Sequence, residues 1–131
     1  MLAGFRRRPA ASGSGANTRL GKQALLFALV GWYLSIGHRD GLATSCAVTS
    51  MASDVARSSD RARAAYTRQV NAYLELFGRL VEGDKPKARR LKALAAWTAL
   101  VGALSMARAV SDDKLSPEIL TAADEVKVRL S

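Results

Sequence analysis

The apolar residues of this 131-residue chain recur at intervals of three and four positions from about residue 20 onward. This spacing is the period of an amphipathic α-helix, whereas runs in which apolar and polar residues alternate, as in a strand, are hard to find. Alanine is abundant and proline is rare, which also favours helices over sheet. The pattern predicts an all-α fold of five helices with short connections, over residues 20–36, 45–57, 60–81, 86–110 and 117–130.

The segment at residues 91–110, LKALAAWTALVGALSMARAV, is the longest apolar run and is apolar on nearly every side. A helix without a polar face has to be buried all round. Ala95, Ala99 and Ala103 recur every four residues beside Gly102, and we call these four residues the small-residue ridge. Small side chains let a second helix approach closely, and one chain of this size has little material to cover every face. The pattern therefore favours a homodimer.

The expected helix ends follow from local residue types. Gly37 is expected to end the first helix in a left-handed conformation, and the polar turn after it would leave His38 in solvent. Asp84 is expected to cap the helix at 86–110, with Pro86 in the first turn, where a missing N–H costs little. Ser116, followed by a proline, predicts the start of the last helix in the same way.

Positive charge is concentrated in two places within a formal net charge of +9. Residues 1–18 are rich in Gly, Ser, Ala and Arg, which predicts a disordered basic tail before a folded domain at 19–131. A strongly basic chain often contacts nucleic acid, although no aromatic residues interleave these cations, and a solvated tail and helix end is the alternative. The two clusters are Arg6, Arg7, Arg8, Arg19 and Lys22, and then Lys85, Lys87, Arg89, Arg90 and Lys92.

Residues suited to catalysis or metal binding are few. His38 is the only histidine and Cys46 the only cysteine, which leaves no zinc ligand set and no intramolecular disulfide. The sequence has no glycine-rich phosphate loop and no nucleophile elbow. We therefore expect no enzymatic activity, no catalytic residues, no metal and no cofactor. The lone cysteine fits a cytoplasmic location, and apolar runs shorter than the roughly 20 residues of a bilayer span predict no membrane partner.

Large apolar side chains lie on the predicted buried faces, and two interpretations of them remain open. They form an ordinary core, or some of them line a pocket for an apolar small molecule, since ligand sites between helices are mostly apolar. Trp97 is the best pocket candidate, because its indole N–H needs a partner at the centre of the most buried helix. The other members of the set are Trp32, Tyr33, Met51, Tyr66, Tyr73, Phe77 and Met106.

The segment at 33–74, YLSIGHRDGLATSCAVTSMASDVARSSDRARAAYTRQVNAYL, resembles the ligand-binding half of tetracycline-repressor-like (TetR/AcrR) transcriptional regulators. That family often carries YLS…HRD, a Gly-Cys pair that opens a helix, an (A/S)(D/E)VAR ending and a (V/A)RAAFT start. A later family helix of the type ALVGALxLARAV is followed by LSxEIL. The matching positions are 33–35, 38–40, 46, 53–57, 63–67, 100–110 and 115–120.

The chain departs from the family pattern at two points. Ser45 stands where the family usually has glycine, which affects only the local turn. The family's N-terminal helix-turn-helix domain has no counterpart in residues 1–18, so direct operator binding is not expected, and DNA contact would need a domain missing from this chain.

The resemblance implies that the helices at 86–110 and 117–130 form a dimeric four-helix bundle with a second copy, with an effector pocket on the inner side of that bundle. The implied function is the regulatory domain of a TetR-like regulator, a homodimer with a place for a small hydrophobic effector. The alternatives are a basic helical nucleic-acid-associated protein and a dominant-negative partner of an intact regulator. The implied pocket residues are Trp32, Met51, Tyr73, Phe77 and Trp97, and the implied dimer residues are Ala95, Ala99, Gly102, Ala103, Ile119, Ala123 and Val126.

Overall fold

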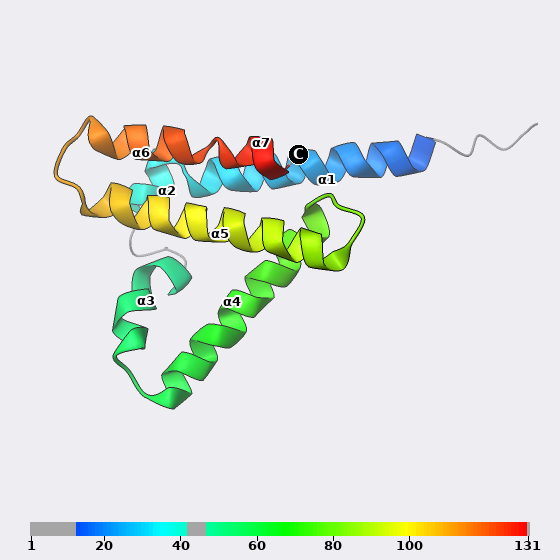
Figure 1. Ribbon diagram of the computed structural model, residues 1–131. Helices are drawn as coiled ribbons and strands as arrows, with labels where there is room; N and C mark the ends of the chain where they lie inside the picture. The colour runs from blue at the N-terminus through cyan, green and yellow to red at the C-terminus, as the bar shows by residue number, and fades with distance from the viewer. Residues whose placement is uncertain (1–12, 42–46, 131) are drawn as a thin grey trace, which may run out of the picture.

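The computed structural model describes residues 13–41 and 47–130, and throughout these ranges its regular structure is helical (Figure 1). The predicted all-α fold class is therefore confirmed. None of the helices in the described ranges has the length and apolar character needed to cross a membrane. The helices in chain order are α1 (Gly13–Tyr33), α2 (Ile36–Asp40), α3 (Ala47–Ala56), α4 (Asp60–Leu80), α5 (Pro86–Ala109), α6 (Leu115–Ala123) and α7 (Val126–Leu130).

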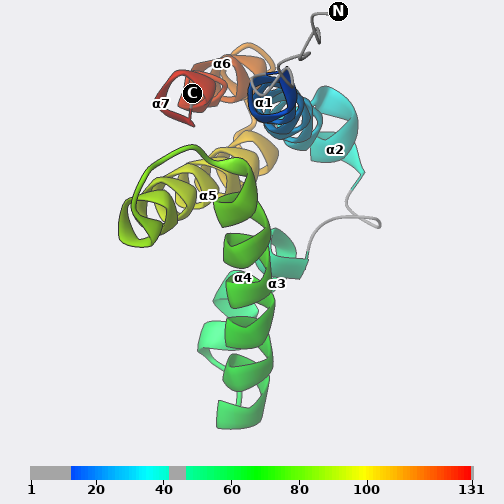
Figure 2. The same ribbon diagram turned by 90° about the vertical axis from the view of Figure 1, so that its right-hand side faces the viewer.

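Helix α5 is the centre of the arrangement, because it packs against every other helix from α1 to α7. Figure 2 shows α1, α2, α6 and α7 gathered on one side of α5, while α4 and α3 extend away on the other side. The first half of α4 leaves that group and has α3 as its neighbour. The segment at 91–110, the longest apolar run of the sequence, thus lies in the helix that contacts all the others in the described ranges.

One side of α5 supplies the core, and the other faces remain exposed in the single chain, so burial of α5 all round by a second copy stays a prediction. Leu91 and Met106 keep 68% and 57% of their surface exposed, and Ala95 and Ala99 are exposed as well. The neighbouring helices of one chain cover only part of the circumference of α5. Its buried residues are Ala93, Ala96, Trp97, Leu100, Ala103, Leu104 and Ala107.

The starts of α4 and α5 agree with the predicted bounds at residues 60 and 86. Ser59 is the N-cap of α4 and its hydroxyl oxygen accepts the N–H of Ala62, which satisfies one of the free donors of a helix start. Pro86 occupies the first turn of α5, where its missing N–H is not needed. The prediction for Asp84 is wrong, because Lys85 takes the N-cap position and makes no side-chain capping bond.

Helix α1 differs from its prediction at both ends. It begins at Gly13, so residues 13–18 are helical and the expected disordered tail is wrong for that part. Residues 1–12 lie outside the described ranges. At the other end α1 stops at Tyr33, and the Ser35 hydroxyl accepts the N–H of His38 to start the short helix α2. Gly37 therefore lies inside α2, and the described chain contains no glycine with positive φ.

The predicted last helix is divided into α6 and α7. Asp112 accepts the N–H groups of Lys114 and Leu115 through Oδ1, so α6 begins slightly before Ser116. The helix is interrupted at Asp124 and Glu125, whose N–H groups bond to carbonyls three residues earlier. Such tighter bonding closes a helical turn early. The predicted second helix corresponds to α3, and its suggested start at residue 45 lies outside the described ranges.

Candidate functional site

A cluster of aromatic rings surrounds Trp97 at the middle of α5. The Tyr73 ring stacks on the indole at a centroid distance of 4.9 Å, and the Phe77 and Tyr33 rings contact it at 5.2 and 5.3 Å. The His38 ring packs against the Tyr33 ring in an edge-on arrangement, with the ring centroids 4.8 Å apart. Helices α1, α2 and α5 thus contribute one ring each and α4 contributes two, and we call these five residues the aromatic cluster.

Two polar atoms of the aromatic cluster are buried without a hydrogen-bond partner among the described residues: Nε1 of Trp97 and Nε2 of His38. The Nδ1 atom of His38 lies 2.7 Å from the carbonyl oxygen of Tyr33. Because a carbonyl can only accept, we assign the proton of the neutral imidazole to Nδ1, which leaves Nε2 as an acceptor. The cluster therefore contains one buried donor and one buried acceptor that residues 13–41 and 47–130 do not satisfy.

The predicted pocket residues divide into two groups. Tyr73, Phe77 and Trp97 come together in the aromatic cluster. Trp32 and Met51 do not join them, because their side chains are 60% and 50% exposed. Trp32 instead stacks on the outer side of His38, with the ring centroids 4.5 Å apart.

The expectation of a solvated His38 is wrong. Its side chain is only 5% exposed, because the short helix α2 turns it back against the end of α1. A sequence indication was available in retrospect: Trp32 and Tyr33 precede the histidine closely enough for both rings to enclose it. The indication is weak, since it depends on the unforeseen break between α1 and α2.

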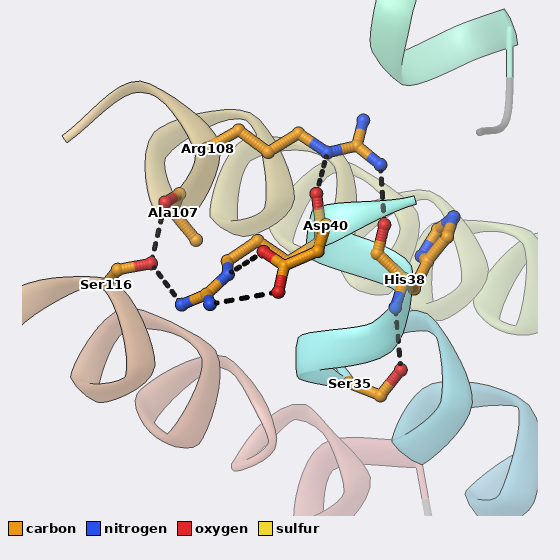
Figure 3. Close-up of polar contacts among 7 residues, drawn as sticks. Ser35, His38, Asp40, Ala107, Arg108 and Ser116 are labelled. Carbon is orange, nitrogen blue, oxygen red and sulfur yellow. Dashed lines mark hydrogen bonds and ion pairs between the residues drawn. The ribbon is translucent and has the colours of Figure 1, made fainter. Parts of the chain in front are cut away.

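A set of polar contacts fastens α2 to the end of α5 and the start of α6 (Figure 3). Arg108 donates from Nη2 to the carbonyl of His38 at 2.8 Å and from Nε to the carbonyl of Arg39 at 3.0 Å. Arg39 in turn donates to the Ser116 hydroxyl at 2.9 Å, and that hydroxyl donates to the carbonyl of Ala107 at 2.7 Å. We call this set the α2 clamp. It holds the backbone of His38 in place relative to α5.

The α2 clamp was not foreseen from the sequence. Nothing in the sequence distinguishes Arg108 from the other arginines of the chain, and Ser116 was interpreted only as a helix cap. Side chains that bond across the fold to carbonyl groups leave no residue pattern, because their partners are backbone atoms that every residue carries.

Replacing Arg108 by methionine should lower the free energy of unfolding by about 1–3 kcal/mol, because two carbonyls at the end of α2 lose charged donors. Arg63→Met is the matched control, since Arg63 is exposed on α4, and its effect should stay within about 0.5 kcal/mol. Urea denaturation measures both values. Equal stability of the two variants would show that the clamp contributes nothing.

A second feature of α5 is an apolar groove of about 380 Å³ between this helix and the pair α6 and α7. Its floor contains alanines from both sides, including Ala95 and Ala99 of α5 and Ala122 and Ala123 of α6. Charged residues of both signs stand at its margin, namely Lys92, Glu125 and Arg129. We call this feature the alanine groove.

The predicted dimer residues do not all lie on an open surface. Ala103 belongs to the core of its own chain. Each step of four residues along an α-helix rotates the side-chain direction by about 40°, so Ala103 points to a different side of α5 than Ala95 does. Val126 is buried as well, although it borders the alanine groove. Of the full set, Ala95 and Ala99 are exposed, Gly102, Ile119 and Ala123 are half-buried, and Ala103 and Val126 are buried.

Comparisons of the chain with protein-family models, with curated proteins and with solved structures gave no match. The resemblance to TetR-like regulators therefore remains a prediction from the motifs. Arg39, which belongs to the HRD motif, and Ser116, which belongs to the LSxEIL match, are joined directly in the α2 clamp. The motif residues thus include contacts that hold the fold together.

Proposed function

We propose that this chain is the regulatory domain of a TetR-like transcriptional regulator, acting in the cytoplasm as a homodimer that senses a small hydrophobic effector. One observation carries the proposal: α5 bears the aromatic cluster on one side and the alanine groove on another. Trp97 on one side belongs to the aromatic cluster, while Ala95 and Ala99 on another side open into the alanine groove. A single helix would then separate the effector from the second subunit.

The alanine groove supports the homodimer. Exposed alanines along α5 let the backbone of another helix approach closely, and the groove between α5 and α6 offers a concave apolar seat for it. In a two-fold dimer the same patch serves both subunits, so a margin with charges of both signs can pair with itself. Lys92, Glu125 and Arg129 supply such a margin.

The two unpartnered nitrogens support the effector. Buried polar groups in native proteins are nearly always hydrogen-bonded, so each exception calls for a reason. A small aromatic molecule with one acceptor and one donor would satisfy the Trp97 indole and His38 Nε2 while its ring packs among the others. Because the α2 clamp ties the backbone of His38 to Arg108, a shift of α2 on binding would reach α5 and with it the alanine groove.

The response to a methyl group at Gly102 tests the dimer. A Cβ added there meets nothing within 4 Å in one chain, and the same is true of Gly21 in α1. In solvent, either Gly→Ala change should stabilise its helix by about 1 kcal/mol. We expect Gly21→Ala to give that gain and Gly102→Ala to give clearly less, since the second copy approaches closely at Gly102. Thermal unfolding measures both, and equal gains would contradict a close approach at this position.

A further inference from the structure

A wide concavity of about 840 Å³ lies between the first half of α1 and the turn that joins α4 to α5. Both views of the ribbon place this turn beside α1 (Figures 1 and 2). Its charged lining consists of five cationic side chains and two carboxylates, namely Arg19, Lys22, Arg79, Arg89, Lys92, Glu82 and Asp84. The fold thus joins in one place members of the two basic clusters that are far apart in the sequence. We call this feature the basic concavity.

Several of these side chains are fixed by contacts with the turn. Arg19 pairs with the carboxylate of Glu82 at 3.0 Å, so one of the two negative charges is already neutralised. Arg89 donates to the carbonyl of Gly83 at 2.6 Å, and the Lys92 ammonium donates to the carbonyl of Glu82 at 3.3 Å. The backbone oxygens hold these cations in place and leave their charge uncompensated.

The side chains of Lys22 and Arg79 form no hydrogen bond or ion pair in the part of the chain that the structure describes, and both line the concavity. The N-terminus of α5 starts beside the concavity and adds to its excess of positive charge. Helix α5 has no acidic residue in its first turn and no side-chain cap, although positive charge at a helix N-terminus is unfavourable. An anion bound among these groups would offset the repulsion.

We propose that the basic concavity binds a small molecule through a chain of two or more phosphate groups. Arginine guanidinium groups pair with phosphate oxygens through two parallel bonds, and lysines add compact charge. A volume of about 840 Å³ exceeds what a single phosphate fills. The described residues of the lining include no aromatic ring on which a base could stack, so recognition falls on the phosphates rather than on a nucleobase. This inference does not rest on the proposed dimer or effector, and of the residues that line the basic concavity only Lys92 also lines the alanine groove.

Isothermal titration of the full chain with tripolyphosphate, ATP, AMP and inorganic phosphate tests the proposal. Tripolyphosphate and ATP should bind with similar affinity, and AMP and inorganic phosphate should bind at least about tenfold more weakly, because fewer phosphate oxygens reach the cations. Equal affinity for all four ligands, or no binding of tripolyphosphate at low salt, would overturn the proposal.

A charge-matched pair of double variants separates a site from general attraction. Lys22→Gln with Arg79→Gln removes two lining cations, whereas Lys87→Gln with Arg90→Gln removes two exposed cations that do not line the concavity. The first pair should weaken tripolyphosphate binding by roughly tenfold or more and the second by less than about threefold, because net charge alone acts on both equally. Equal losses would overturn the proposal, provided that circular dichroism shows both variants folded.

Duplex DNA serves as the competing ligand in the same titration. A phosphate-binding concavity should keep tripolyphosphate bound when DNA is added at moderate salt, since contacts made only by charge attraction weaken steeply with salt. Displacement of tripolyphosphate by DNA at moderate salt would contradict the proposal and favour a nucleic-acid surface instead.

Discussion

Truncation of Leu100 to alanine should lower the free energy of unfolding by about 3–5 kcal/mol, the upper part of the range for buried leucines. Leu100 is 0% exposed and lies on the side of α5 on which the other helices converge. Its removal leaves a cavity that rigid neighbours cannot fill. A domain of this size has a total stability of only about 5–15 kcal/mol, so the variant should be close to unfolding at body temperature.

Leu94→Ala is the matched control for Leu100→Ala, because it makes the same change on the same helix. Leu94 is 40% exposed and does not line the alanine groove, so the loss should be about 1 kcal/mol or less. Urea denaturation measures both, with an unchanged dependence on urea concentration as the sign that the unfolded states are comparable. Similar losses for the two variants would show that the faces of α5 are wrongly assigned.

Ala99→Arg should separate the proposed homodimer into monomers and raise its dissociation constant by at least about 100-fold, since an unpaired charge would be buried twice across a two-fold interface. Ala99 is exposed in the single chain, so the arginine can extend into water once the subunits part. The circular dichroism spectrum of the monomer should therefore keep its helical form. Size-exclusion chromatography with light scattering measures the change in mass.

Ala65→Arg gives the corresponding control, because Ala65 is an exposed alanine of α4 that is far from the alanine groove in the sequence and on a different helix. The dimer should tolerate this change, and its dissociation constant should stay within about threefold of that of the unmodified chain, as for an exposed substitution. If Ala65→Arg dissociates the protein as strongly as Ala99→Arg, the interface is not at the alanine groove.

Much of the fold could be predicted from local residue types. The bounds of α4 and α5 agree with the apolar spacing and with Ser59 and Pro86, because capping and first-turn preferences act within a few residues. The break between α6 and α7 and the early end of α1 could not be predicted in this way. The break depends on the backbone bonds of Asp124 and Glu125 to carbonyls three residues earlier. The early end of α1 depends on the bond between the Ser35 hydroxyl and the backbone N–H of His38. The apolar pattern records neither contact.

The candidate site was predicted only in part, because the helical period records which residues share a face but not which other segments contact that face. Tyr73, Phe77 and Trp97 share predicted buried faces, so their convergence follows from the helical period. The exposure of Trp32 and Met51 depends on which helix faces the neighbouring helices leave uncovered, and the apolar period does not contain this information. The burial of His38 was not predicted for a further reason. A polar residue beside a glycine is typical of a turn, whereas the burial of His38 depends on its contact with the Tyr33 ring and on the bond from Arg108 to its carbonyl.

Sedimentation equilibrium of the unmodified chain at micromolar concentration tests the homodimer most directly. We expect a species of twice the 14.0 kDa mass of the chain, because in the proposed homodimer a helix of the second copy would cover the alanines of α5 that the described helices leave exposed. A species of 14.0 kDa across the whole micromolar range would contradict the homodimer and, with it, the proposed role of α5 as the wall between effector and partner.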